Sequence, residues 1–96
     1  ACSATGIGEI AIRLVLAKHV CDQMHRGETA QESVENAITL VNQRLHIRNS
    51  MGLIAVDTRG RIGAAHNTPN LCWAHITPKT TKPKASMKAK LIIQTN

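Results

Sequence analysis

The sequence predicts an α+β fold made of two helices, then a β-hairpin and a further short strand. Three observations carry this prediction. Apolar residues recur every three or four positions from Gly8 to Arg26, a helix-start signal stands at residues 29–32, and the periodicity changes to that of strands after residue 50. The 96 residues suffice for one domain, but Trp73 is the only Phe, Tyr or Trp, so aliphatic side chains must form its core.

The first helix is expected from Gly8 to Arg26, with Glu9 suiting its positive end and Gly27 ending it. Further apolar side chains widen its apolar stripe past half the circumference. We therefore expect this helix to be covered on more than one side. The stripe itself comprises Ile10, Leu14, Ala17, Cys21 and Met24.

The second helix begins at the spacing of a capping box, in which Thr29 and Glu32 satisfy backbone donors of the first turn. The pattern predicts that it ends near residues 46–49. It is amphipathic, so we expect it to cover the fold from outside. The apolar face holds Val34, Ala37, Ile38, Val41 and Leu45, and the polar face holds Glu32, Glu35, Asn36, Asn42 and Gln43.

Residues 51–57 are a short apolar run closed by a turn at 57–60, and residues 61–66 form the return strand of a hairpin. Residues 71–76 fit either a strand or a turn of helix. A single hairpin is marginally stable in water. We therefore expect it to join a larger sheet supplied elsewhere.

The net charge of +6 is concentrated in a tail. Residues 1–76 carry seven Lys and Arg against six Asp and Glu, whereas residues 77–96 carry five lysines and no acid. This division predicts a domain fragment at 1–76 and a basic, largely flexible tail at 77–96. Residues 91–93 are either an ordered anchor or part of that tail.

Cysteine usage and hydropathy indicate the class of protein. Three widely spaced cysteines do not describe a disulfide framework, no apolar run is long enough to span a bilayer, and no signal peptide is visible. We expect a cytoplasmic protein with reduced thiols and no membrane contact. Cys21 with His25, and Cys72 with His75, have spacings loosely like zinc-ligand pairs, but together they fit no common finger, so no metal or cofactor is predicted.

The stretch Ser3-Ala4-Thr5-Gly6-Ile7-Gly8-Glu9 leads into the first helix. Gly6 to Ala11 formally matches a dinucleotide fingerprint, yet a second helix follows where a strand is needed, and Glu9 would repel a pyrophosphate. Two interpretations remain open from the residues alone. Either the glycines only let the chain turn into the helix, with Thr5 as its cap, or the backbone N–H groups and hydroxyl form a donor cluster for an oxyanion.

A resemblance decides between them. The Thr5 to Glu9 segment, followed by Ile12-Arg13, resembles the TG-x-GE segment in the β subunit of plant-type L-asparaginases, also called isoaspartyl peptidases. The likeness covers about residues 1–76 and continues in order through the sets Gly52 to Asp57, Gly60, Asn67-Thr68 and Trp73-Ala74. It implies part of the four-layer αββα sandwich of the N-terminal nucleophile hydrolases.

The family resemblance also implies a chemistry. A precursor cleaves itself and exposes a threonine whose hydroxyl attacks L-asparagine or a β-aspartyl (isoaspartyl) dipeptide, with its own amine as base. The Thr5 hydroxyl and Gly6 N–H would form the oxyanion hole, and Gly8 would line the substrate site. The nucleophile is expected upstream of what matches Ala1, so the implied partners are the rest of the precursor (α subunit and N-terminal β segment) in a homodimer of heterodimers.

The lysine tail supports a different class of function. A small basic module could contact nucleic acid or another anionic partner by neutralising phosphates, although the tail itself has no aromatic residue for base stacking.

Overall fold

The α+β prediction is confirmed by the computed structural model of the chain, which describes residues 1–93. Within these residues, strand β1 is followed by three helices, α1 to α3, and then by five strands, β2 to β6. Their bounds are β1 Cys2–Gly6, α1 Gly8–Leu14, α2 Leu16–His25, α3 Ala30–Leu45, β2 Met51–Val56, β3 Ile62–His66, β4 Trp73–His75, β5 Lys84–Ser86 and β6 Lys90–Leu91.

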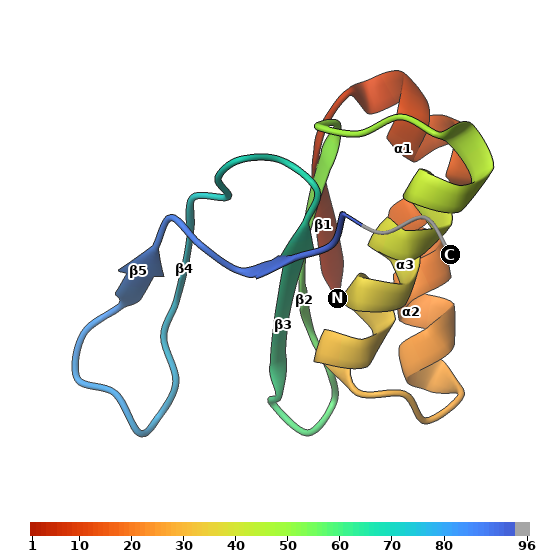
Figure 1. The fold of residues 1–96 in the computed structure, drawn as a ribbon. Helices are drawn as coiled ribbons and strands as arrows, with labels where there is room; N and C mark the ends of the chain where they lie inside the picture. Colours follow the sequence, from red (N-terminus) through yellow and green to blue (C-terminus); the bar gives the residue numbers. More distant parts are fainter. Residues whose placement is uncertain (94–96) are drawn as a thin grey trace.

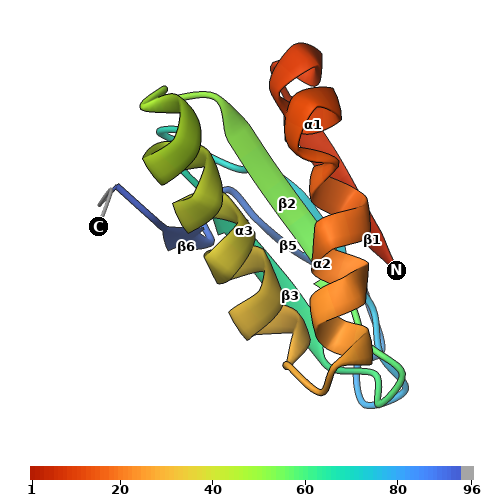
Figure 2. The ribbon, with the colours of Figure 1, turned by 90° about the vertical axis from the view of Figure 1, so that its right-hand side faces the viewer.

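The body of the molecule has two layers, a sheet and the helices on one of its faces (Figures 1 and 2). The sheet has the strand order β1-β2-β3-β6, in which β1 and β3 are antiparallel to β2 and the short β6 is parallel to β3. The predicted hairpin is confirmed as β2 and β3, and this chain itself supplies a neighbour on each side of it. Strands β4 and β5 form a separate arm that projects from the opposite face of the sheet.

Successive side chains along each strand point to opposite faces of the sheet. Leu53 pairs with Ala65 and faces the helices, where both side chains are buried. The alternate residues Ile54 and Val56 face the other way and are 37% and 42% exposed. The outer face of the sheet is therefore apolar and only partly covered.

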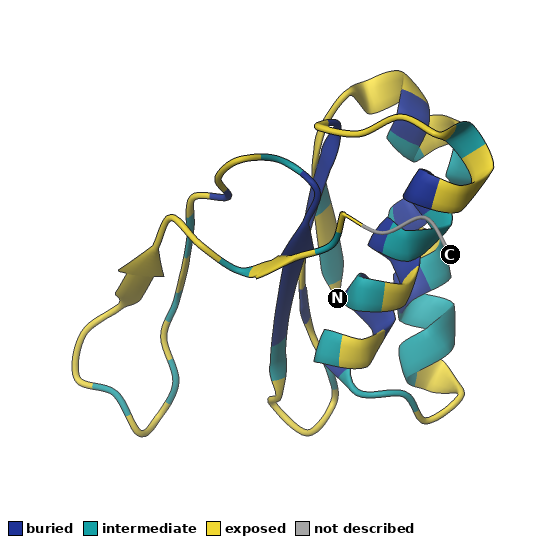
Figure 3. Ribbon diagram, in the orientation of Figure 1, coloured by how far each residue is buried: buried dark blue, intermediate teal, exposed yellow. Residues whose placement is uncertain are grey.

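Both long helices lie side by side in one layer (Figure 2). The predicted division into an inner first helix and an outer second helix is wrong, because α3 packs over the central strands β2 and β3 while α2 packs over the edge strand β1. Figure 3 shows the buried residues gathered between α3 and the central strands. The buried residues of α3 are Ala30, Ser33, Val34, Ala37, Ile38, Val41 and Asn42.

The helix predicted from Gly8 to Arg26 is two helices. Val15 adopts a left-handed backbone conformation, with φ 49° and ψ 50°, which ends α1 and starts α2. Its N–H donates to the carbonyl of Ile12 at 3.2 Å, and its carbonyl accepts from the N–H of His19 at 2.9 Å. The prediction of one helix was wrong because apolar spacing reports which residues face the core, not the dihedral angles of a single residue.

The Val15 conformation gives a first prediction. A left-handed conformation costs an L-residue roughly 1–2 kcal/mol, and asparagine tolerates it better than a β-branched residue. Because Val15 is 59% exposed, little burial is lost on substitution. We expect Val15→Asn to raise the free energy of unfolding by about 1 kcal/mol in urea denaturation. Ile12→Asn, at a 77% exposed site in regular helix, is the control and should give no gain.

The start of α3 confirms the predicted capping signal. The Thr29 hydroxyl oxygen accepts from the N–H of Glu32 at 3.0 Å, and the hydroxyl donates to the Glu32 carboxylate at 2.9 Å. The last helical residue is Leu45, and His46 caps the helix with a left-handed backbone, at the start of the predicted range of 46–49.

Asp57 organises the hairpin turn and joins it to α3. Its carboxylate accepts from the N–H groups of Arg59 and Arg61, from the Arg61 guanidinium at 2.7 Å, and from the N–H of Ala30 at 3.3 Å. Burial by itself would raise the pKa of Asp57, but these donors outweigh it and hold the pKa below its usual value.

The lowered pKa of Asp57 predicts a pH dependence of stability. The carboxylate form is favoured by folding, so its contribution is complete above about pH 4, the pKa of an unfolded aspartate, and is lost as pH falls through the lower pKa of the folded state. Urea denaturation from pH 7 to pH 2 should show this loss in the native chain. In Asp57→Asn the fall should be smaller, and superimposable pH profiles would contradict the assignment.

The segment after residue 76 makes two short pairings in the described structure. In the arm, β5 pairs with β4, which confirms the strand alternative for residues 71–76. Further along, β6 pairs with β3, and Ile92 packs against the core and donates its N–H to the carbonyl of His66 at 2.8 Å, which places an anchor at 91–93. The division at residue 76 and the flexibility of the tail stay predictions, and residues 94–96 lie outside the described residues. Among residues 1–93, no helix is long and apolar enough to cross a membrane.

Candidate functional site: the Thr5–Gly6 corner

The strand β1 leads directly into the glycine motif and was missed in the sequence. It runs antiparallel to β2, so Thr5 lies beside Gly52 and Gly6 beside Met51. A strand therefore does precede the motif, but α1 is followed by two more helices, and the next strand, β2, pairs antiparallel with β1. This topology excludes the dinucleotide interpretation. The interpretation of Thr5 as a helix cap is wrong, because the N-cap of α1 is Ile7 and no side chain caps it.

The chain turns sharply where β1 ends and α1 begins, and we call residues Thr5 and Gly6 at this point the Thr5–Gly6 corner. The backbone conformation there requires glycine at position 6. Its φ of +131° is one that residues with a side chain rarely adopt, and a Cβ at this position would overlap the carbonyl oxygen of Ser50. That same oxygen accepts the N–H of Ile7 at 2.9 Å. The end of β1 is thus held tightly against the start of β2.

Thr5 points to the outer face of the sheet, opposite the helices. The neighbouring residues Cys2 and Ala4 pack against the core, so the pleat directs Thr5 the other way. Thr5 is exposed, and within the described residues its hydroxyl has no hydrogen-bond partner. It lines a cavity of about 180 Å³ together with Ser3, Ala4, Gly52, Leu53, Ile54, Leu71 and Cys72.

The hydrogen-bond phase of the β1–β2 ladder determines where the Gly6 N–H points. Ala1 and Val56 exchange two hydrogen bonds, at 2.8 and 2.9 Å, and Ile7 bonds Ser50. In an antiparallel pair the bonding residues alternate, so the odd-numbered residues of β1 face β2 and the even-numbered ones face away. Because β1 is an edge strand, the Gly6 N–H points off the sheet without a strand partner among the described residues.

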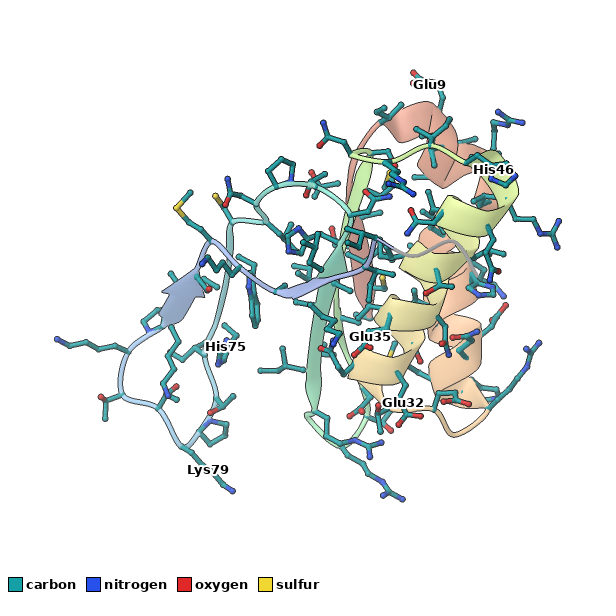
Figure 4. The ribbon with its side chains drawn as sticks, in the orientation of Figure 1. Glu9, Glu32, Glu35, His46, His75 and Lys79 are labelled. Carbon is teal, nitrogen blue, oxygen red and sulfur yellow. The ribbon has the colours of Figure 1, made fainter. Side chains whose placement is uncertain are left out.

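Gly8 opens the first turn of α1 beyond this corner. Nothing lies within 4 Å of the position that a Cβ on Gly8 would take. Glu9 follows it and points away from the body at the top of α1 in Figure 4. Thr5, Gly6 and Gly8 therefore lie together on one exposed segment, although the 180 Å³ cavity is lined by Thr5 alone among them.

The thiol of Cys2, on the same strand, packs against the core on the face opposite Thr5. Burial, with a further contribution from the nearby Cys21 thiol, raises the pKa of Cys2 to about 11, so it is protonated at neutral pH.

The two Cys–His pairs with spacings like those of zinc ligands lie apart in the structure. Cys21 and His25 line one cavity, whereas Cys72 and His75 each line another. Within residues 1–93 no three His, Cys, Asp or Glu side chains gather as a metal-ligand set.

One residue of the corner was not identified from the sequence. Asn67 directly follows β3 and is 5% exposed, and its side chain accepts the N–H groups of Ser50 and Met51 at the start of β2. Asn42, predicted on the polar face of the second helix, is instead fully buried beside it. Helical spacing assigned Asn42 to solvent because amphipathic patterns do not reveal a buried polar pair.

Comparison with known proteins supplies the family. A sequence profile of the asparaginase family matches residues 1–85, which runs past the resemblance noted at residues 1–76. The plant-type L-asparaginase of Pyrococcus abyssi is 39% identical over 85 residues, covering 88% of this chain and 28% of that protein. Its counterpart in Pyrococcus horikoshii is 38% identical over the same shares, and that of Pyrobaculum calidifontis is 37% identical over 69% of this chain and 22% of the relative.

The chain thus spans 28% of the length of the first of these relatives. Its sheet with helices on one face is part of the N-terminal nucleophile hydrolase sandwich that this family implies. With a match over residues 1–85 and 39% identity to a plant-type L-asparaginase, the chain belongs to the asparaginase family.

Proposed function

We propose that this chain supplies the oxyanion hole of an amidohydrolase that cleaves the side-chain amide of L-asparagine. The observation that carries the proposal is the pair of donors at the Thr5–Gly6 corner. The Thr5 hydroxyl lies on the outer face of the sheet, and the Gly6 N–H points off the adjacent edge. An acyl oxygen placed off that edge, on the outer side, meets both donors.

The two donors act on charge that develops in the reaction. When a hydroxyl attacks the amide carbonyl, the carbonyl oxygen becomes an oxyanion, and preorganised donors stabilise it more than they stabilise the ground state. The amide nitrogen then leaves as ammonia, and water hydrolyses the acyl-enzyme. Gly8, with open space beside it, lets a substrate head group approach the backbone closely.

The attacking group comes from another segment in this proposal. In the family that group is an N-terminal threonine released by self-cleavage of a precursor, with its own amine as base. Thr5 has no free α-amine within this sequence, so it serves as a donor and not as the nucleophile.

The proposal also includes the other chain segments with which this chain assembles. The apolar outer face, with Ile54 and Val56 exposed, suits a second sheet contributed by the rest of the precursor, namely the α subunit and the N-terminal β segment. The complete enzyme is a homodimer of such heterodimers, acts in the cytoplasm, and also hydrolyses β-aspartyl (isoaspartyl) dipeptides. The dimer and the dipeptide substrate rest on the family resemblance, and the cytoplasmic location rests on the odd number and wide spacing of the cysteines.

Reconstitution tests the proposal. This chain is produced alone and together with the remaining segment of a plant-type L-asparaginase, and ammonia release from L-asparagine and aspartate release from a β-aspartyl dipeptide are measured. We expect no turnover by the chain alone and turnover by the assembly. Turnover by the chain alone would contradict the assignment of the nucleophile, and a silent but assembled complex would contradict the proposed activity.

The arm favours a second candidate function, binding of a single-stranded nucleic acid. All five lysines from residue 79 to residue 90 are exposed, and Lys79 lies at the tip of the arm (Figure 4). The structure also brings two aromatic rings to the lysines, since Trp73 and His75 stack at 5.3 Å on β4, and His75 pairs with Lys84.

Charge neutralisation tests this second candidate. We expect the triple variant Lys79→Gln, Lys82→Gln, Lys84→Gln to bind a single-stranded oligonucleotide more weakly than the native chain. The slope of log K against log salt concentration should become shallower by about 0.7 for each phosphate contact that is lost. Retention on an oligonucleotide column at increasing salt measures both. A native chain that elutes at the lowest salt would exclude the function.

A further inference from the structure

A buried polar network lies between the sheet and α3, directly behind the Thr5–Gly6 corner. Asn67 is at its centre, immediately after β3. Asn42 from α3 and Ser50 from the segment before β2 complete it, and the two are 0% and 2% exposed. None of these side chains takes part in the donor pair of the proposed function.

Asn67 is bonded to the segment before β2 through both its side chain and its backbone. Its side-chain oxygen accepts the N–H groups of Ser50 at 2.9 Å and Met51 at 2.8 Å. Its backbone N–H donates to the carbonyl of Met51 at 3.0 Å, and its carbonyl accepts from the N–H of Asn49 at 3.0 Å. The backbone of residues 49–51 is therefore held at four points by one residue.

The other side of the same backbone forms the surface against which Gly6 lies. The carbonyl oxygen of Ser50 accepts the N–H of Ile7 at 2.9 Å and occupies the space where a side chain on Gly6 would begin. A shift of the Ser50–Met51 peptide would therefore move the Gly6–Ile7 peptide with it. The Gly6 Cα joins that peptide to the Thr5–Gly6 peptide, which carries the Gly6 N–H, so the contacts of Asn67 bear on the direction of this donor.

We infer that Asn67 is a positioning residue for the oxyanion hole, acting through Ser50 on the Gly6 N–H. This inference rests on the proposed function for its catalytic consequence. Its mechanical part, that Asn67 holds the Gly6–Ile7 corner through Ser50, stands on the contacts alone.

The amide group of Asn67 suits this task because it accepts on one side and donates on the other. Its nitrogen donates to the side-chain oxygen of Asn42 at 2.8 Å and to the Ser50 hydroxyl at 3.2 Å. Asn42 in turn donates to the carbonyl of Ile92 at 3.1 Å. A carboxylate in place of Asn67 keeps the acceptor but loses the donor, and an aliphatic side chain leaves two buried N–H groups unpaired.

Hydrogen exchange of the Ile7 amide tests the mechanical part on this chain. The Ile7 N–H bonds to Ser50, so its exchange reports opening of the corner. In Asn67→Ala we expect the Ile7 amide to exchange about tenfold or more faster than in the native chain. If Asn67→Ala does not fold, Asn42→Ala removes one partner of the Asn67 amide and should accelerate exchange by a smaller factor. An unchanged rate in the folded variant overturns the inference.

A matched control separates this effect from general destabilisation. Gln31 on α3 also uses a side-chain amide to hold a strand, donating to the carbonyl of Ala64 at 3.0 Å and accepting its N–H at 2.9 Å. Ala64 pairs with Ile54, two residues along β2 from Gly52, the partner of Thr5. Gln31→Leu should leave Ile7 exchange close to the native rate, and equal acceleration in both variants overturns the inference.

The reconstituted assembly tests the catalytic consequence. In Asn67→Ala, kcat for L-asparagine should fall about tenfold to a hundredfold with KM within about twofold, because the donor acts on the transition state. A raised KM with unchanged kcat overturns the positioning role. If the native assembly has no activity while Ile7 exchange responds as expected, the proposed function fails and the mechanical inference stands.

Discussion

Replacing Gly6 with alanine is expected to destabilise the chain by about 3 kcal/mol or more, combining left-handed strain with a steric overlap. The new methyl group would overlap the Ser50 carbonyl oxygen, and Ser50 is backbone held by Asn67, so it has no freedom to move aside. Relieving this overlap would require breaking the hydrogen bond between the Ile7 N–H and the Ser50 carbonyl. Urea denaturation of Gly6→Ala against the native chain measures the loss.

Gly8→Ala is the control for this prediction. Nothing lies within 4 Å of its added methyl group, and Gly8 is the first residue of α1, where alanine is the better helix former. We expect Gly8→Ala to leave stability unchanged or to raise it by up to about 1 kcal/mol. Equal losses in the two variants would show that the fold depends on glycine in this loop generally and not on the contact at Ser50.

Thr5→Val is expected to lower turnover of L-asparagine about 10²- to 10³-fold in the reconstituted assembly while leaving the fold intact. Valine keeps the shape and the strand propensity of threonine and removes only the hydroxyl. Because that hydroxyl has no hydrogen-bond partner within residues 1–93, its removal leaves no donor or acceptor of this chain unpaired. Steady-state kinetics together with urea denaturation measures both effects.

Ser3→Ala controls for the loss of a hydroxyl from the same strand and face. Ser3 is exposed, lines the same cavity and lies two residues before Thr5 on β1. We expect its turnover to stay within about threefold of the native value, since it has no donor role. If the assembly with Thr5→Val hydrolyses L-asparagine at the native rate, the assignment of Thr5 to the oxyanion hole is contradicted.

Much of the fold was predictable from local sequence signals. Thr29 and Glu32 predict the start of α3, because a capping side chain acts within one turn of helix. The hairpin was predictable because Asp57 and Gly60 form the turn between two apolar runs. Gly6 was recognised as a site residue through its motif, although the pattern did not reveal the carbonyl group that excludes a side chain there.

Other features had no local signal. The five-residue strand β1 is apolar on one side only and forms because β2 lies beside it, with 44 residues between Gly6 and its partner Met51. The left-handed Val15 interrupts a helical pattern without changing the apolar spacing. The buried pair of Asn42 and Asn67 gave no local signal, because its hydrogen bonds join α3 to residues near β2 and β3 that lie far away in the chain.

By itself, the sequence determined the class of fold, the family motifs and the type of residue at each turn and cap, since these depend on interactions within a few residues. Only the tertiary structure decided which face Thr5 presents, where the Gly6 N–H points and that Asn67 stands behind them. These properties depend on strand register and on contacts between residues far apart in the chain, and register is established only when the sheet and α3 pack together.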